Sequence, residues 1–268
     1  MTDPVQQPRP GERVAVVDWR RYLQTFHDER AGTLERVLSR TIAGDHTPYR
    51  WLARAVSATG GRVLDLACGS GAMTRELDQP GRTVTGLDLS AGELGVAASR
   101  HPGPWLRADA LRLPIADGTI DAVTSCMGLV VVTPLDTLIA EVARVLKPGG
   151  LLAAIAPAVR PLGARDLRTL TPLTTRLRTR PQFPGPVELT SFVETLNRHG
   201  LRKVEDARER YHFTISSRTD AELLLSALYL PTTRKSRIEM VTEYLERRIN
   251  RHGPVEVAVP MRRLVAIK

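Results

Sequence analysis

The stretch RVLDLACGSGAM, residues 62–73, decides the fold of this 268-residue chain. It begins as an apolar strand and ends in small residues, among them Gly69 and Gly71, before a helical pattern starts. Glycines at a strand-to-helix junction let the backbone come close to a ligand. Two classes of nucleoside-containing cofactor bind at such turns, and the residues in the turn and after it distinguish between the two classes.

After this turn, predicted strands and helices alternate along the chain. Strands that alternate with helices predict an α/β fold with a doubly wound, mostly parallel sheet. Such sheets bind ligands at the carboxyl ends of their strands. The expected strands are 62–68, 82–90, 104–110, 120–126 and 151–157, and the expected helices are 71–81, 91–103 and 134–150.

The flanking segments differ from this core. Residues 1–13 contain three prolines and are expected to be disordered. Residues 14–58 carry apolar side chains at helical spacing and are expected to form a lid. Residues 59–268 are expected to be effectively one domain, with a cofactor-binding core at 60–157 and a substrate-side tail at 158–268. Within the tail we expect an irregular Pro- and Arg-rich stretch at 158–186, helices at 187–200, 220–230 and 234–253, and strands at 202–215 and 254–268.

Composition narrows the class of protein. The apolar fraction of 42% is ordinary for a globular chain. No window approaches the roughly 18 apolar residues of a membrane span, and the first residues do not resemble a signal peptide. A cytoplasmic protein without a membrane partner is therefore expected. Two cysteines, Cys68 and Cys126, are too few for a disulfide framework.

The net charge of +9 is unevenly distributed. Residues 159–268 carry 21 basic and 12 acidic side chains, which accounts for the whole excess. A basic surface attracts nucleic acid, phosphate or carboxylate ligands, although an arginine-rich solvated face is the simpler interpretation. Within the six arginines between positions 160 and 180, Arg176 and Arg178 are candidate contacts for an anionic or polar substrate.

The turn itself separates the two cofactor classes. A dinucleotide fingerprint needs a third glycine where this chain has Thr74. The sequence VLDLACGSG instead resembles the first motif of the class I S-adenosylmethionine-dependent methyltransferases. Ala67 stands where that pattern has a glycine, and we expect it to be tolerated with a negative φ. VTGLDLS, RADALRLPIADGTIDAV and EVARVLKPGGLLAAIAP resemble the following motifs in order, so the resemblance covers about residues 60–157. The segments FHDERAGTLERVL (26–38) and TPYRWL (47–52) further resemble a type 11-like bacterial subgroup of small-molecule methyltransferases.

This resemblance implies a Rossmann-like, seven-stranded sheet that binds S-adenosyl-L-methionine and releases S-adenosyl-L-homocysteine. It implies that Asp65 fixes the turn and reaches toward the cofactor ammonium group, that Asp88 accepts hydrogen bonds from both ribose hydroxyls, and that Asp109 accepts one from the adenine amino group. The full set of expected cofactor contacts is Asp65, Ala67, Cys68, Gly69, Gly71, Asp88, Leu89, Asp109, Ala110, Ser125, Tyr22 and Arg30.

Catalytic residues are harder to predict. Methyl transfer from a sulfonium is an in-line displacement that depends mainly on placing the nucleophile about 3–3.5 Å from the methyl carbon. A general base is needed only when the acceptor must lose a proton. The segment SCMGLVVV beyond the fourth strand offers no His, Asp or Glu, and Cys126 in it is expected to be a buried wall of the pocket. His27, His212 and Tyr211 are candidate catalytic residues, and Phe26 and Met127 are candidate substrate contacts; no metal is expected.

The favoured function is methyl transfer to a small-molecule acceptor, for example a specialised metabolite. An RNA methyltransferase is the alternative that the basic tail suggests, but aromatic residues for base stacking make up only 4% of the chain. A non-catalytic cofactor-binding partner and non-methyl chemistry on the same scaffold are further alternatives. The sequence leaves open whether the acceptor atom is O, N, S or C, and it leaves the oligomeric state open.

Overall fold

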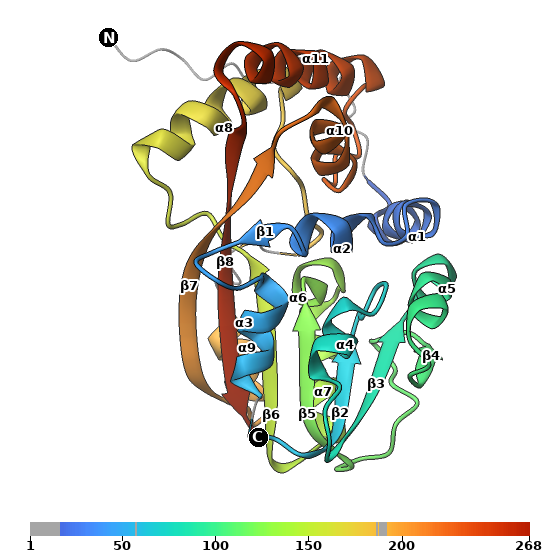
Figure 1. Cartoon of the computed structure of the whole chain (residues 1–268). Coiled ribbons are helices and arrows are strands. Elements are labelled where there is room, and N and C mark those ends of the chain that lie inside the picture. The colour runs from blue at the N-terminus through green and yellow to red at the C-terminus, as the bar shows by residue number, and fades with distance from the viewer. Residues whose placement is uncertain (1–16, 57, 186, 188–191) are drawn as a thin grey trace, which may run out of the picture.

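The computed structural model describes residues 17–56, 58–185, 187 and 192–268, so the disorder expected at 1–13 lies outside the described residues. The described chain is built on an eight-stranded sheet of order β1-β7-β8-β6-β5-β2-β3-β4 (Figure 1). Its strands are β1 (Thr41–Ile42), β2 (Gly61–Leu66), β3 (Arg82–Asp88), β4 (Trp105–Arg107), β5 (Ile120–Cys126), β6 (Leu146–Pro157), β7 (Arg202–Ile215) and β8 (Val255–Ile267).

The five strands β2 to β6 are parallel, as the alternation of strands and helices predicts. β2 pairs with β3 and β5, β3 pairs with β4, and β5 pairs with β6. The last four residues of β2 are buried, as in a strand that is covered on both faces. Strands β2 to β8 form the expected seven-stranded sheet, and the two-residue β1 adds an eighth strand by pairing with the edge of β7.

The last two strands, β7 and β8, form the antiparallel part of the sheet. β8 pairs with both β6 and β7, and the predicted strands 202–215 and 254–268 are confirmed within a residue. The predicted helix 134–150 is too long, because α7 ends at Val145 and the chain continues directly into β6. Pro148 disfavours helical backbone just before it, and the ion pair between Lys147 and Asp121 fixes the start of β6 beside β5.

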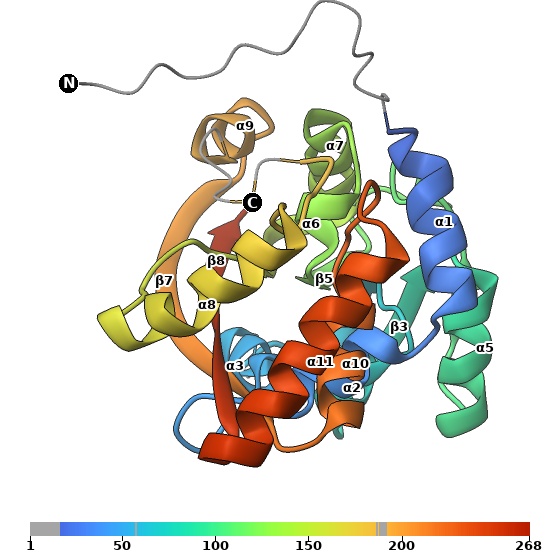
Figure 2. The same ribbon diagram turned by 90° about the horizontal axis from the view of Figure 1, so that it is seen from above.

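Helices cover the sheet and also one of its ends. Figures 1 and 2 show α1, α2, α10 and α11 gathered beyond the ends of β2, β3 and β5, with α8 beside α11. The helices are α1 (Trp19–Glu29), α2 (Thr33–Leu38), α3 (Pro48–Ala55), α4 (Ala72–Leu77), α5 (Ala91–Arg100), α6 (Gly128–Val131), α7 (Leu135–Val145), α8 (Ala164–Leu177), α9 (Phe192–Arg198), α10 (Arg218–Ser226) and α11 (Lys235–His252).

The stretch 158–186 is more regular than expected, because it contains the 14-residue helix α8. The Asp166 carboxylate accepts a hydrogen bond of 2.7 Å from the Gly163 N–H at the start of that helix. Leu173 and Leu177 are buried in a hydrophobic cluster that also takes in α10, α11 and the ends of β7 and β8. We call α8, α10 and α11 the roof. Helix α8 lies in the connection between β6 and β7, and helices α10 and α11 lie in the connection between β7 and β8.

The predicted lid divides into two parts. Tyr49, Trp51 and Leu52 of α3 are buried in the cluster that also holds Met73 and Ile155, so α3 is part of the covering of the sheet. Helices α1 and α2 lie instead at the carboxyl ends of the strands (Figure 1). The name lid is kept here for α1 and α2 alone.

Candidate active site

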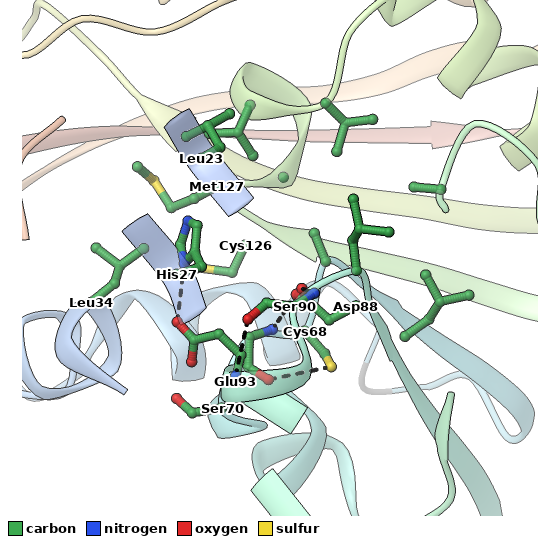
Figure 3. A pocket seen from close by; sticks show the side chains of 18 of the residues that line it. Leu23, His27, Leu34, Cys68, Ser70, Asp88, Ser90, Glu93, Cys126 and Met127 are labelled. Carbon is green, nitrogen blue, oxygen red and sulfur yellow. Dashed lines mark hydrogen bonds and ion pairs between the residues drawn. The ribbon is translucent and has the colours of Figure 1, made fainter. Parts of the chain in front are cut away.

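A cavity lies at the carboxyl ends of β2, β3 and β5, where doubly wound sheets bind ligands (Figure 3). The lid contributes one side of it and the strand ends the other. Its lining residues include Arg20, Leu23, His27, Leu34, Leu38, Asp65, Ala67, Cys68, Gly69, Asp88, Leu89, Glu93, Asp109, Ala110, Cys126, Met127, Val131, Val132 and Tyr229.

The glycine-rich turn has left-handed backbone at three positions. Gly69 has φ +55°, Gly71 has φ +82°, and Ala67 has φ +55°. The expected negative φ at Ala67 is therefore wrong, and a side chain in this conformation costs roughly 1–2 kcal/mol. The Ala67 methyl group is accommodated because Gly128 lies against it: a Cβ at position 128 would stand 2.9 Å from the Ala67 Cβ.

Gly71 is needed for packing and is not one of the residues lining the cavity. A Cβ built there would lie 2.5 Å from the Trp105 ring, which also lies against Gly86. The positive φ and the indole of Trp105 account for a glycine at position 71, and its expected contact with the cofactor stays a prediction.

Asp65 is fully buried at the end of β2 and lines the cavity. The hydroxyl groups of Thr74 and Thr124 donate hydrogen bonds to it, at 2.6 and 3.3 Å. Burial raises the pKa of this carboxyl to about 7, and the hydroxyl bonds only partly oppose that shift. Thr74, which breaks the dinucleotide fingerprint, therefore has a definite role as a donor to Asp65.

Asp88 connects the end of β3 to the glycine-rich turn. Its carboxylate accepts hydrogen bonds from the Gly69 N–H at 2.8 Å and from the Ser90 N–H at 2.9 Å, one on each oxygen. Burial raises its pKa. A carboxylate offers about four acceptor positions, so about two remain for a ligand in the cavity.

Asp109, Ala110 and Leu89 lie together at the cavity, as the sequence predicts. Asp109 accepts hydrogen bonds from the Leu111 N–H and from the guanidinium of Arg20, both at 3.0 Å. Arg20 was not predicted as a site residue. Its side chain is 70% exposed, so this ion pair contributes little to stability, but it joins the lid to the loop after β4.

Three predicted contacts on or beside α1 do not line the cavity. The hydroxyl of Tyr22 accepts a hydrogen bond from the Leu230 N–H, Phe26 packs against Tyr229 with ring centroids 4.8 Å apart, and Arg30 stacks on Phe26. Positions 22, 26 and 30 share one helix face, whereas the lining residues at 20, 23, 24 and 27 share another. In this structure these side chains fasten the lid to the segment between α10 and α11, and the cofactor roles expected for Tyr22 and Arg30 and the substrate role expected for Phe26 stay predictions.

His27 is the one catalytic candidate that the structure places in the cavity. Its Nδ1 lies 3.0 Å from Glu93 Oε1, and its Nε2 lies 2.8 Å from the Tyr229 hydroxyl oxygen. Glu93 and Tyr229 are 3% and 4% exposed, and the second oxygen of Glu93 accepts the Gly32 N–H at 2.9 Å. A carboxylate, an imidazole and a phenol thus form one continuous row at the cavity wall.

The sequence patterns around Glu93 and Tyr229 predict structural roles for these residues rather than functional ones. Ser90 and Glu93 have the spacing of a capping box, and the Ser90 hydroxyl does accept the Glu93 N–H. The Glu93 carboxylate nevertheless reaches the lid instead of returning to its own helix. Tyr229 lies three residues after the end of α10, within the apolar pattern that predicts a helix at 220–230, so it resembles an ordinary core residue, and only the tertiary fold brings it to the cavity.

Residues after β5 form another part of the wall. Cys126 and Met127 line the cavity, and burial raises the pKa of the Cys126 thiol far above its usual range. Cys68 also lines it as a buried thiol. Ser125, an expected cofactor contact, is fully buried and not among the lining residues, and its hydroxyl donates to the Leu66 carbonyl at 2.9 Å; its cofactor contact stays a prediction.

Four further candidates are not among the lining residues. Tyr211 and His212 alternate on β7 as expected, with Tyr211 buried beside Trp51 and His212 placed 3.7 Å from Asp166. The guanidinium of Arg176 stacks 3.8 Å from the Tyr244 ring, and Arg178 ends α8 on the exposed surface. The structure places none of these four among the lining residues, and the catalytic and substrate roles expected for them stay predictions.

The fold and the site define an α/β protein of the kind that binds a nucleoside cofactor at its strand ends. Residues 64–154 match the family model described as "Methyltransferase domain". A demethylmenaquinone methyltransferase from Lactiplantibacillus plantarum is 31% identical over 201 residues, which cover 67% of this chain and 82% of that protein. The chain belongs to the class I S-adenosylmethionine-dependent methyltransferases.

Other relatives match more locally or through the fold alone. A demethylmenaquinone methyltransferase from Corynebacterium urealyticum is 46% identical over 96 residues, which cover 36% of this chain and only 41% of that relative. The solved structure of the cyclase SpnF has a TM-score of 0.58 at 20% identity and covers 93% of this chain and 92% of its own. That likeness shows the fold and does not identify a reaction.

The residues present fit the cofactor that this family uses. Asp88 has spare acceptor positions for two hydroxyl groups, and the buried Asp65 carboxyl has only hydroxyl donors among the described side chains. The large apolar side chain of Leu89 is 36% exposed, so it offers a free surface on which an aromatic base can pack. Within the described residues there is no group of three or more His, Cys, Asp or Glu placed to hold a metal, and no helix among them is long and apolar enough to cross a membrane.

Proposed function

We propose that this protein transfers a methyl group from S-adenosyl-L-methionine to a small-molecule acceptor, such as a specialised metabolite. One observation supports this above all others. Asp65, Asp88 and Asp109 come from the ends of three parallel strands, and all three open on one cavity together with the Gly69 turn. A cofactor with an ammonium group, a ribose and an adenine offers donors to all three carboxyl groups.

In this proposal each carboxyl group has its own partner. Asp88 accepts hydrogen bonds from the ribose hydroxyls while it keeps its bonds to the Gly69 and Ser90 N–H groups. Asp65 provides negative charge for the ammonium group. Asp109 accepts from the adenine amino group, and Leu89 packs on the face of the base.

The bound cofactor supplies a methyl group that is already activated by a positively charged sulfur. The protein then has to hold the acceptor atom about 3–3.5 Å from that methyl carbon, in line with the breaking bond. The lid and the segment between α10 and α11 do this by enclosing the cavity: Arg20 bonds to Asp109, and His27 bonds to Glu93 of α5 and to Tyr229 of that segment. Enclosure also excludes water that would compete for space at the methyl group.

The wall around His27 supports an apolar acceptor of small size. Figure 3 shows Leu23, Leu34 and Met127 around the His27 imidazole, and Asp88 lies to the right of this group in the view. Pockets of this kind are mostly apolar with a few polar groups that fix orientation. The names of the curated relatives also refer to a small molecule, demethylmenaquinone, as the acceptor.

The RNA alternative draws on the basic tail, and much of that charge is internally paired. Arg218 forms ion pairs with three glutamates of α10 and α11. Arg262 and Lys203 both pair with Asp206. The acidic partners are already counted in the net charge of +9, so these pairs show only that several basic side chains of the tail take part in the fold. We favour the small-molecule acceptor because aromatic residues for base stacking make up only 4% of the chain. Salt-dependent RNA binding would favour the alternative.

Calorimetry with S-adenosylhomocysteine tests the cofactor site. Asp88→Asn should weaken binding by about 1.5–3 kcal/mol, the range for a hydrogen bond to a charged group. Asp121→Asn is the matched control, because Asp121 also accepts a backbone N–H, from Arg62, but lies at the start of β5. Equal affinity of the two variants would refute the assignment. Tight binding without transfer to any acceptor would favour a non-catalytic partner.

A further inference from the structure

With Glu93 ionised and His27 neutral, the hydrogen bonds of the row Glu93–His27–Tyr229 can run in only one direction. An ionised Glu93 can only accept, so the Nδ1 of His27 carries the proton and donates it at 3.0 Å. The Nε2 of a neutral His27 is then an acceptor, and the Tyr229 hydroxyl donates to it at 2.8 Å. Tyr229 keeps its oxygen lone pairs, and both Tyr229 and His27 line the cavity.

We propose that this row is a proton relay, and that the acceptor is an apolar molecule carrying a hydroxyl group that Tyr229 deprotonates as the oxygen is methylated. The proposal rests on the proposed methyl transfer. It adds the acceptor class and the three residues that remove the proton, of which Tyr229 touches the acceptor and His27 and Glu93 act through it.

The step balances in atoms and charge. The acceptor oxygen forms a bond to the methyl carbon as the carbon–sulfur bond breaks, and the electron pair of that bond stays on the sulfur. The acceptor O–H proton passes to the Tyr229 oxygen while the Tyr229 proton passes to Nε2 of His27. The resulting imidazolium is stabilised by the Glu93 carboxylate at 3.0 Å, and its proton later leaves to water.

The surroundings support a relay over a free phenolate. Tyr229 is packed by Phe26 and Phe183, with ring centroids at 4.8 and 5.5 Å, so its hydroxyl is held in place. Burial, and next the charges of Glu93 and Asp88, raise the pKa of Tyr229 far above its usual range. Tyr229 therefore keeps its proton until a base can take it, and His27 is placed to do so.

The acceptor class follows from what the relay provides. A neutral amine or a thiolate already has a lone pair to attack with, whereas a neutral hydroxyl is a poor nucleophile until its proton is removed. A buried Glu93, whose second oxygen is occupied by the Gly32 N–H, is costly unless its charge is used or paired. The apolar side chains Leu23, Leu34 and Met127 around His27 provide surface for a hydrocarbon skeleton.

The test compares Tyr229→Phe with wild type and with the matched control Tyr211→Phe. Tyr211 is a buried tyrosine of β7 that does not line the cavity, and its hydroxyl has no hydrogen-bond partner among the described residues. The probes are 2-naphthol, 2-naphthylamine and 2-naphthalenethiol, with pentafluorophenol as a hydroxyl acceptor that is already ionised at neutral pH. We expect Tyr229→Phe to lose about 100-fold or more in kcat on 2-naphthol, to keep its rate on pentafluorophenol, and to bind S-adenosylhomocysteine as wild type does.

A second readout does not depend on turnover. Nitrogen NMR of the His27 ring should show a protonated Nδ1 and an Nε2 that accepts a hydrogen bond, and the Nε2 signal should move in Tyr229→Phe but not in Tyr211→Phe. Equal losses on 2-naphthol and pentafluorophenol, wild-type transfer only to the amine or thiol, or an unchanged Nε2 signal would each overturn the relay. Failure of wild type to bind S-adenosylhomocysteine would instead overturn the proposed function itself.

Discussion

The buried carboxyl group of Asp65 makes cofactor affinity dependent on pH. In the free protein its pKa is raised to about 7 by burial, so at pH 6 about 9% of the molecules carry an ionised Asp65 and at pH 8 about 91% do. The proposed ligand group is an ammonium ion, which binds the ionised form and lowers the pKa in the complex. Cofactor affinity should therefore rise with pH across this interval.

The size of the effect follows from these fractions. When only the ionised form is competent to bind, the apparent dissociation constant equals the intrinsic one divided by the competent fraction. Between pH 6 and pH 8 that fraction rises about tenfold, so the apparent Kd for S-adenosylhomocysteine should fall about tenfold, which is about 1.4 kcal/mol. Above pH 8 the gain should level off, because Asp65 is then almost fully ionised.

Calorimetric titrations at several pH values measure this directly. The comparison ligand is 5′-methylthioadenosine, which keeps the ribose and adenine but lacks the ammonium group. Asp88 also has a raised pKa, and its effect should appear with both ligands and cancel in the comparison. Asp65→Asn keeps the shape of the side chain and should remove the difference between the two ligands. A slope shared by both ligands, or one that persists in Asp65→Asn, would refute the assignment of Asp65 to the ammonium group.

Three further predictions concern stability and use chemical denaturation. Asp65 should lower the unfolding free energy as pH rises from about 4 to about 7, because the folded carboxyl holds a proton that the unfolded chain has lost; the slope of the unfolding free energy against pH should therefore be more negative in wild type than in Asp65→Asn, and equal slopes would contradict the raised pKa. Tyr211→Phe should leave stability unchanged or raise it by about 1 kcal/mol, since it removes a buried hydroxyl without a hydrogen-bond partner among the described residues; a clear loss would reveal a partner. Gly71→Ala should cost about 2 kcal/mol or more, because it places a Cβ 2.5 Å from Trp105 at φ +82°; a neutral outcome would mean that the indole moves freely.

The parallel core could be predicted from the sequence because its determinants are local. Each strand is an apolar run followed by a turn and a helix, and this order alone favours the doubly wound sheet. The acidic residues at the strand ends, Asp65, Asp88 and Asp109, could be placed at one edge for the same reason. Their distances from the glycine-rich turn follow from the topology.

The rest depends on tertiary packing. α1 carries aromatic residues on more than one face, so the pattern alone does not say that the face with Leu23 and His27 meets the cavity while Tyr22 and Phe26 meet the segment between α10 and α11. The positive φ at Ala67 depends on space left by Gly128, 61 positions later in the chain. Neither relationship leaves a trace in local periodicity.

The hydrogen bond between His27 and Tyr229 joins positions 202 residues apart. The matched family region spans residues 64–154, and neither partner belongs to it. Under the proposed function, substitutions in these two outer segments should change the choice of acceptor while leaving the carboxyl groups of Asp65, Asp88 and Asp109 in place, because all three lie within the matched region.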